Sequence, residues 1–261
     1  MLTGSQITDY LVRIGVEGRP APTAANLAML MERHLTSVPF ETVGLCRAGR
    51  APDLRLSALF DKMVRRRRGG YCFELNKLFE ALLAALGYDA RPCLSRSADV
   101  PGQRDPINHR GLLVALDGDL LLADVGYGGP APAAPLRLAP VGPQFVAGAW
   151  FEAVPLDACW WRIDRFRPGA AGEGPGERLG VLELCVARVE DADFEALNLA
   201  CSQPGTEFRD QEMANLRTAS GHVSLTGDRL VIRDGATRRQ LDLADADRAA
   251  ALRDLFGLVY D

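Results

Sequence analysis

The spacing of the apolar side chains changes at Gly87, and this change constrains the fold more than any other feature of the sequence. Before Gly87, apolar residues recur three and four positions apart, the period of a helix with one buried face: Leu75, Leu78, Phe79, Leu82, Leu83 and Leu86. Gly87 stands where a left-handed helix end favours glycine. Similar stripes begin at Ile7, Leu27 and Leu56, so the first 86 residues are predicted to be helical and to form a bundle.

After Gly87 the apolar residues gather in short runs between Asp-Gly, Pro and Gly clusters, a pattern typical of strands. These runs cover residues 110–116, 120–125, 160–166, 181–189 and 223–232. Three other stretches, 37–42, 128–143 and 168–180, are predicted to be loops because of their proline, glycine or mixed composition. A final helix is expected over 245–256. The expected fold class is therefore α+β, with a central sheet or barrel.

The composition is that of an ordinary globular protein, with 48% hydrophobic and 25% charged residues. A formal charge of -4 gives no reason to expect a nucleic-acid partner. The sequence contains neither an apolar run of about eighteen residues nor a signal segment, so we expect a cytoplasmic protein without a membrane span. The six cysteines form no C-x-x-C pair, and only three histidines are present, so free thiols and no metal site are expected.

A cysteine lies where two glycines give way to the helix that ends before Gly87. Residues 68–76 read RGGYCFELN, which places Cys72 in or just before the first helical turn. Unpaired N–H groups and the positive end of the helix dipole stabilise an anion there, so the thiolate form is favoured and Cys72 can act as a nucleophile. The alternative is a small buried core residue.

A histidine and an aspartate lie on two predicted strands joined by Asp117-Gly118, a strong hairpin signal. If these two residues form the turn, Asp124 is the diagonal neighbour of His109 on one face, about 7 to 8 Å away. A turn shifted by one residue places Asp124 too far away, and a three-residue turn sends it to the other face. In the first register, Asp124 can fix the tautomer of His109 and leave its other nitrogen facing a thiol. Taken separately, a structural histidine and a turn residue are the simpler interpretations.

Three other features have weaker signals. His34 is expected at the edge of the helical core, and His222 in a turn. The run 65–68 of four arginines can bind phosphate, although a solvated helix end is its commoner meaning. Within that run, Arg68 can pair with Glu41 or Glu74 and so support the loop that directly precedes Cys72, here called the cysteine loop.

With these three residues in place, the sequence resembles the arylamine N-acetyltransferase family. The resemblance covers nearly the whole chain and rests on VPFE at 38–41, RGGYCFELN at 68–76, His109-Arg110, DVGYG at 124–128, and DFE at 193–195 with Asn198. It implies three parts around a cysteine-protease-like core: a helical bundle with the cysteine over 1–87, a β-barrel with the histidine and aspartate over 88–190, and an α/β lid over 191–261.

The resemblance also implies a two-step acetyl transfer from acetyl-CoA, the co-substrate, to an aromatic amine or hydrazine through an acetyl-cysteine. Cys72 would be the nucleophile, His109 the proton carrier and Asp124 the residue that orients it, with no permanently bound cofactor. Glu41 and Arg68 would support the cysteine loop. The implied substrate contacts are Phe40 and Tyr127 for the amine, Gly126 and Gly128 for the acyl and pantetheine portion, and Ser202 and Phe208 for CoA.

The chain departs from the family pattern at two places. Thr42 stands where the family usually has Asn, and CSQPGT at 201–206 replaces a Ser-Thr-His-Pro-Ser-Ser-like string. The missing histidine bears on the CoA contacts and on the preferred acyl donor.

Three alternatives remain open. The first is an amide synthase of the same family that closes macrolactams from carrier-protein thioesters. A papain-like or transglutaminase-like enzyme is the second, because it shares the order of cysteine and histidine. The third is a catalytically inactive interaction protein, which leaves the three filled positions unexplained.

Overall fold

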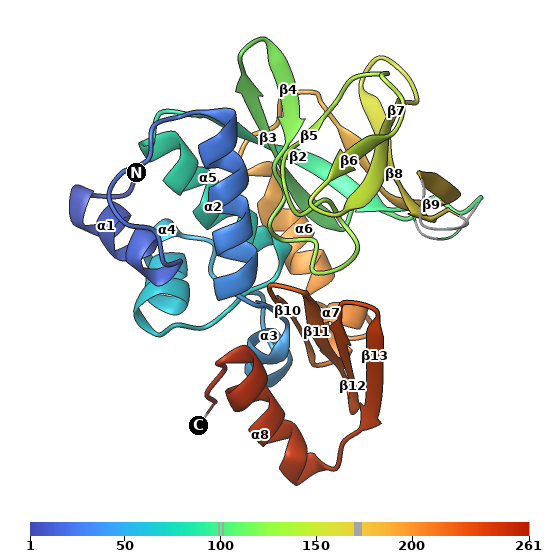
Figure 1. Cartoon of the computed structure of the whole chain (residues 1–261). Coiled ribbons are helices and arrows are strands. Elements are labelled where there is room, and N and C mark those ends of the chain that lie inside the picture. The colour runs from blue at the N-terminus through green and yellow to red at the C-terminus, as the bar shows by residue number, and fades with distance from the viewer. Residues whose placement is uncertain (99, 101, 170–173, 261) are drawn as a thin grey trace.

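The computed structural model describes residues 1–98, 100, 102–169 and 174–260. Most helices from the first third of the chain gather beside a large curved sheet, while α3 lies with a smaller sheet and the last helix, below both in the view (Figure 1). The architecture is α+β, as predicted.

Six helical segments precede residue 86: α1 (Gly4–Arg13), α2 (Ala24–Ser37), α3 (Val43–Ala48), α4 (Leu56–Phe60), the π-helical η1 (Asp61–Arg65) and α5 (Cys72–Ala85). The side chain of Thr3 accepts a hydrogen bond from Gln6 N at the start of α1, and that of Thr23 accepts one from Asn26 N at the start of α2, which satisfies backbone donors that a helix start leaves free. The last of these helices, α5, ends before Gly87, whose φ of 95° lies in the left-handed region, as predicted.

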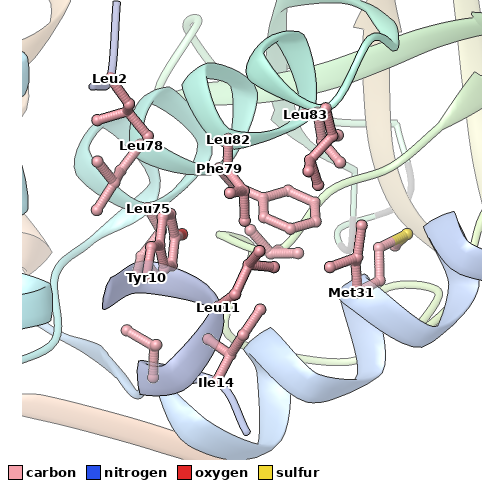
Figure 2. Packing of buried hydrophobic residues seen from close by; sticks show 14 of the residues in the cluster. Leu2, Tyr10, Leu11, Ile14, Met31, Leu75, Leu78, Phe79, Leu82 and Leu83 are labelled. Carbon is pink, nitrogen blue, oxygen red and sulfur yellow. The ribbon is translucent and has the colours of Figure 1, made fainter. Parts of the chain in front are cut away.

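The core of the bundle lies between α1, α2 and α5 (Figure 2). The packed side chains shown there include Tyr10, Leu11, Ile14, Met31, Leu75, Leu78, Phe79, Leu82 and Leu83. Burial of each large apolar side chain contributes about 1.5 to 3 kcal/mol, so this contact fixes the position of α5 and of its first residue, Cys72.

His34 is completely buried in this core and not at its edge, which corrects the prediction. Its ring contacts Tyr10 and Phe79, with centroids 6.0 and 5.1 Å away. Burial, reinforced by the charge of Arg13, lowers the pKa of His34 to about 3, so the ring is neutral at pH 7.

The large sheet is antiparallel and curls into a nearly closed barrel in the order β5-β4-β3-β2-β9-β8-β7-β6. Its strands are β2 (Asp89–Ser97), β3 (His109–Leu116), β4 (Asp119–Leu122), β5 (Leu136–Arg137), β6 (Gln144–Val146), β7 (Ala149–Pro155), β8 (Trp160–Pro168) and β9 (Pro175–Cys185). The apolar residues on the inner face, including Leu113, Phe151, Ile163 and Leu182, form a second core.

Several predicted boundaries in this sheet were wrong. The run 120–125 forms a strand only as far as Leu122, although Ala123 N still donates to Leu112 O of β3 at 2.9 Å. Strand β9 begins inside the predicted loop 168–180, and its first residues are exposed, so no apolar pattern marks them. Residues 170–173 of that loop lie outside the described part of the chain. The predicted loop 128–143 contains the short strand β5.

The smaller sheet has the order β1-β10-β11-β12-β13 and packs against α8 (Asp245–Phe256), whose bounds match the prediction. Its strands are β1 (Phe40–Glu41), β10 (Met213–Arg217), β11 (Gly221–Thr226), β12 (Arg229–Asp234) and β13 (Thr237–Asp242). The run 223–232 is thus a hairpin of two strands, and His222 lies in β11 and not in a turn. Helices α6 (Asp193–Cys201) and α7 (Glu207–Asp210) connect the two sheets along the chain.

The strand β1 was predicted as part of a loop, yet it forms the edge of the smaller sheet. Phe40 pairs with Asn215, and a parallel bridge joins Phe40 to Gly70. Strand β1, from the first third of the chain, is therefore part of a sheet whose other strands all come from residues after 212. Division into 1–87, 88–190 and 191–261 remains a prediction.

Candidate active site

Cys72 is the first residue of α5, so its sulfur lies at the N-terminal end of a helix that the apolar core holds rigidly. The preceding loop is fixed by β1, because Glu41 N donates to Gly70 O at 2.8 Å. The cysteine is buried, and its sulfur lies 3.9 Å from the backbone oxygen of Asn108. That oxygen directly precedes β3, the strand that begins with His109.

The hairpin between β3 and β4 has the register on which the sequence argument depended. Leu116 faces Asp119, so Asp117 and Gly118 form the turn. Beyond the paired residues, Nε2 of His109 lies 2.5 Å from Oδ2 of Asp124. The imidazole also hydrogen-bonds to Cys72, so the structure brings the three predicted residues together.

The electrostatics of this group favour a charged imidazole. Burial opposes a charge on His109, but the negative charges of Asp124 and then of Cys72 outweigh it and raise the pKa of His109 to about 10. Burial likewise opposes a charge on Asp124, yet His109 and hydrogen bonds from Asn76 and Gly126 hold the pKa of its carboxyl below its usual value. The aspartate is therefore a carboxylate and the histidine an imidazolium at neutral pH.

Asn76 positions Asp124, a role that was not predicted from the sequence. Its Nδ2 donates to Asp124 Oδ1 at 2.8 Å and to Arg110 O at 2.5 Å, while its Oδ1 accepts from Val125 N at 2.9 Å. Asn76 follows Cys72 by four residues, so both side chains lie on one face of α5. That spacing within the motif was the signal that could have identified it.

A group of ion pairs between α5, β1 and the residues before Cys72 supports the cysteine loop. Lys62 Nζ contacts both carboxylate oxygens of Glu74 at 2.8 and 2.9 Å and lies 3.5 Å from Glu41. Arg68 lies 4.0 Å from Glu41, one of its two predicted partners, and its guanidinium stacks 3.4 Å from the centre of the Tyr260 ring. Glu74, the other predicted partner of Arg68, pairs with Lys62, which sequence reasoning missed because Lys62 belongs to no motif.

Arg110 joins the start of β3 to α5 and to the segment that contains α6, next to the site. Its guanidinium is fully buried and contacts Glu80 of α5 at 2.7 Å and Asp191 at 2.8 Å, and it stacks over the ring of Phe194 in α6. Because Arg110 follows His109 directly, these ion pairs fix the start of β3 against both helices. The other arginines of the run 65–68, residues 65–67, are exposed, in agreement with a solvated helix end.

Of the four predicted contacts for the amine and acyl portions, Tyr127 lies against His109, and Gly126 and Phe40 lie on the side of Cys72. The rings of Tyr127 and His109 pack edge to face, with their centroids 5.2 Å apart. The hydroxyl of Tyr127 donates to Val181 O at 2.6 Å. A Cβ on Gly126 would lie 2.9 Å from Cys72 Cα, and one on Gly128, whose φ is 72°, would lie 2.7 Å from the ring of Phe40. Glycine at these two positions therefore permits the close packing beside the thiol.

The two predicted CoA contacts from the lid are placed differently from each other. Ser202 is buried at the end of α6, and its hydroxyl donates to Asn198 O in the same helix at 2.7 Å. Phe208 is half-buried in α7, with its ring edge toward Tyr71 at 5.9 Å. Tyr71 in turn hydrogen-bonds to Asn198. CoA contacts by Ser202 and Phe208 stay a prediction.

Thr42, the first departure from the family pattern, has a structural role. Its hydroxyl donates to Gln211 O at 2.7 Å and accepts from Met213 N at 2.9 Å, which joins the end of β1 to β10.

Among the described residues, His, Cys, Asp and Glu form no cluster of three arranged for a metal ion. The described helices also include none with the length and apolar character needed to cross a bilayer.

Comparison with known proteins places the chain in a family. A family model described as N-acetyltransferase matches residues 23–261, and both similar proteins and similar structures carry the name arylamine N-acetyltransferase. The chain belongs to the arylamine N-acetyltransferase family. It is 38% identical over 134 residues to such a protein of Mycolicibacterium smegmatis, which is 49% of either chain. The aligned region thus spans about half the length of this curated relative.

Other members of the family resemble the chain over longer or shorter regions. Proansamycin X synthase of Amycolatopsis mediterranei is 35% identical over 139 residues, which is 51% of this chain and 53% of that protein. The structure of the Salmonella typhimurium enzyme has a TM-score of 0.90 at 26% identity and covers all of this chain and 94% of its own. A Mycobacterium marinum member in complex with CoA has a TM-score of 0.86 at 29% identity, with 96% and 92% coverage.

Proposed function

We propose that the protein is an arylamine N-acetyltransferase that transfers an acetyl group from acetyl-CoA to an aromatic amine or hydrazine. The transfer would follow a ping-pong mechanism through an acetyl-cysteine at Cys72. The observation that carries this proposal is the convergence of a thiol at a helix start, the imidazole of His109 and the carboxylate of Asp124, because these groups supply a nucleophile, a base and an orienter. Family membership and the CoA-bound relative support the choice of acyl donor.

In the first step the Cys72 thiolate attacks the carbonyl carbon of the thioester. The bond between that carbon and the CoA sulfur breaks, and the imidazolium of His109 protonates the departing sulfur. A pKa of about 10 keeps His109 charged beside Cys72 before substrate arrives. Since one thioester replaces another, the acetyl-cysteine keeps the reactivity of its precursor.

In the second step the amine nitrogen attacks the carbonyl carbon of the acetyl-cysteine. The nitrogen loses a proton to His109, and the bond to sulfur breaks to regenerate the thiolate. Asp124 holds the imidazole in place and stabilises its charged form in both steps. Phe40 and Tyr127 supply aromatic surface for the amine, while Gly126 and Gly128 leave room for the acyl and pantetheine portions. Arg68 and Glu41 support the loop.

The function is expected in the cytoplasm, where acetyl-CoA is available and the thiol stays reduced. Acetyl-CoA acts as a co-substrate, and the proposal includes no permanently bound cofactor and no nucleic-acid partner. Of the three alternative functions, the amide synthase is favoured by the 35% identity to proansamycin X synthase. Such an enzyme would take its acyl group from a carrier-protein thioester and would be indifferent to acetyl-CoA.

The decisive experiment is intact-mass spectrometry of the purified protein mixed with acetyl-CoA. We expect one added acetyl group on Cys72, which disappears when an arylamine is supplied. Cys72→Ser should show neither adduct nor turnover while keeping its fold, and Cys159→Ser, which alters an exposed thiol, should behave like the wild type. Full turnover in Cys72→Ser would rule out the mechanism. An adduct from a carrier-protein thioester but none from acetyl-CoA would establish the amide synthase.

A further inference from the structure

Two thiols from different helices face one backbone oxygen in the site. The sulfur of Cys72, at the first residue of α5, lies 3.9 Å from Asn108 O, and the sulfur of Cys201, at the last residue of α6, lies 3.8 Å from the same atom. Both cysteines are buried, with 1% and 8% of their surfaces exposed. Cys201 opens the CSQPGT segment, where the chain departs from its family pattern.

The surroundings of the pair keep the second thiol near the first. Both cysteines belong to one apolar cluster, in which the rings of Phe73 and Phe194 pack edge to face at 6.1 Å. Phe73 adjoins Cys72 on α5, and Phe194 lies on α6 with Cys201, so this contact joins the two helices. Burial and then the negative charge of Cys72 raise the pKa of Cys201 to about 12. In the resting site Cys201 is therefore a neutral thiol.

We propose that Cys201 is the resolving cysteine of a reversible disulfide with Cys72, formed when a hydroperoxide oxidises the nucleophile. The proposal rests on the proposed function in one respect, namely that Cys72 is an activated thiolate. A thiolate with a nearby second thiol is the arrangement in which a sulfenic acid is captured before further oxidation.

The chemistry balances in two steps. The Cys72 thiolate first attacks one oxygen of the hydroperoxide, so that an S–O bond forms and the O–O bond breaks. The departing oxygen takes a proton from the imidazolium of His109 and leaves as water or an alcohol. The sulfur has then lost two electrons to the peroxide and is a neutral sulfenic acid.

In the second step the Cys201 thiol gives its proton to the now neutral His109 and attacks the oxidised sulfur. The S–S bond forms, the S–O bond breaks, and hydroxide leaves as water with the proton from His109. Loss of the charge on Cys72 in the first step removes one of the causes that hold the pKa of Cys201 high. Oxidation of the nucleophile thus prepares the second thiol to react.

The disulfide would block acyl transfer but preserve the nucleophile. A free sulfenic acid can continue to sulfinic and sulfonic acids, which thiol reductants do not reverse. A cysteine that carries an acetyl group has no thiolate to oxidise. Acetylation of Cys72 by acetyl-CoA should therefore protect the protein against both disulfide formation and irreversible oxidation of the thiol.

The test uses hydrogen peroxide on the full-length protein, followed by peptide mapping without reduction. We expect a linked pair of peptides containing Cys72 and Cys201, a protein mass lower by two hydrogen atoms, and recovery of activity with dithiothreitol. In Cys201→Ala, the same treatment should give Cys72 with two added oxygen atoms and little recovery. Cys46→Ser is the matched control, because Cys46 is a half-buried thiol that contacts the lid at Phe208 O, and it should recover like the wild type.

Either of two results would overturn the proposal: wild-type Cys72 reaches the sulfinic acid without forming the linked peptides, or Cys201→Ala recovers as fully as the wild type. Peptide mapping of the wild type needs no variant, so poor folding of Cys201→Ala would not leave the question open. The mapping also needs no acyl substrate. If the linked peptides form but no acetyl adduct is seen with acetyl-CoA, the proposed function fails and the disulfide stands.

Discussion

Asn76 donates a hydrogen bond to Asp124 at 2.8 Å and so links the helix that begins at Cys72 to the carboxylate of the site. The same side chain bonds to Arg110 O and Val125 N, on both sides of the hairpin. One face of one helix therefore carries the sulfur and also fixes the residue that orients the base.

Substitution of Asn76 by Ala should lower both stability and turnover. The change leaves the Arg110 carbonyl and the Val125 N–H without their buried partner, and each unsatisfied group costs about 1 to 3 kcal/mol. Urea denaturation and kcat/KM measure the two effects. Asn26→Ala is the control, since Asn26 donates to Ala21 O at an exposed site, and it should change the unfolding free energy by less than about 0.5 kcal/mol. Equal effects of the two changes would contradict the buried role.

A methyl group added at Gly126 should disturb the site directly. The new Cβ would lie 2.9 Å from both Cys72 Cα and Asn76 Nδ2, closer than real side chains approach. We expect Gly126→Ala to lose about 1 to 3 kcal/mol of stability and most of its kcat. Gly129→Ala provides the comparison, because its nearest neighbour, Tyr127, would be 3.6 Å away. An active, stable Gly126→Ala protein would show that the backbone here tolerates displacement.

The two lysines of the chain offer a matched pair for the buried charges. Lys62→Met leaves Glu74 and Glu41 buried without their closest cation, and breaking a buried pair in this way costs about 3 to 5 kcal/mol. Lys77→Met removes a pair with the exposed Asp191, which should cost less than about 1 kcal/mol. Denaturant midpoints compare the stabilities of the two variants. A loss of stability in Lys77→Met as large as that in Lys62→Met would refute the special role of the buried Lys62 pairs.

The pairing of His109 with Asp124 should make stability depend on pH in a defined direction. The pKa of His109 is raised from 6.5 to about 10 in the folded protein, so its contribution is complete below pH 6.5 and is lost as the pH rises toward 10. The pKa of Asp124 is lowered from 3.8, so its contribution is present above that pH and is lost as the pH falls through the lowered value.

Unfolding free energies of the wild type and of His109→Gln, measured across pH, check this directly. Their difference should be nearly constant between about pH 4 and 6.5 and should shrink above pH 6.5. Arg137 and Asp119, a half-exposed pair on the same barrel, provide a control, and Arg137→Gln should show no such trend. A difference that grows as the pH rises toward 6.5 and is constant above it would mean that His109 is neutral in the folded protein.

Local signals made much of the fold predictable. The helix before Gly87, the hairpin turn at Asp117-Gly118 and the helix over 245–256 each have their own spacing or turn residues, and the structure contains all three. Strand β1 could not be predicted, because two residues have no period and their partner, β10, lies far along the chain. The exposed start of β9 was missed for a related reason, since pairing with β8 and ion pairs of its charged side chains hold it, and neither leaves an apolar pattern in the sequence.

The residues of the site also fall into two groups, those with a local signal in the sequence and those without one. Cys72, His109 and Asp124 could be proposed from sequence because a helix start and a hairpin register are local features. Lys62 and Arg110 could not, because their importance arises from buried partners on other elements. A buried arginine or lysine looks like any surface charge until its neighbours are known.

The pairing of Phe40 with Asn215 sets the order in which a growing chain can complete its site. Strand β1 and the loop before Cys72 leave the ribosome early, but β10, which covers the other side of β1, follows on the order of ten seconds later at ordinary rates of synthesis. During that interval the cysteine loop lacks the sheet that encloses it. The nascent protein therefore carries its thiol out of the ribosome before the later segments that bury that thiol have been made.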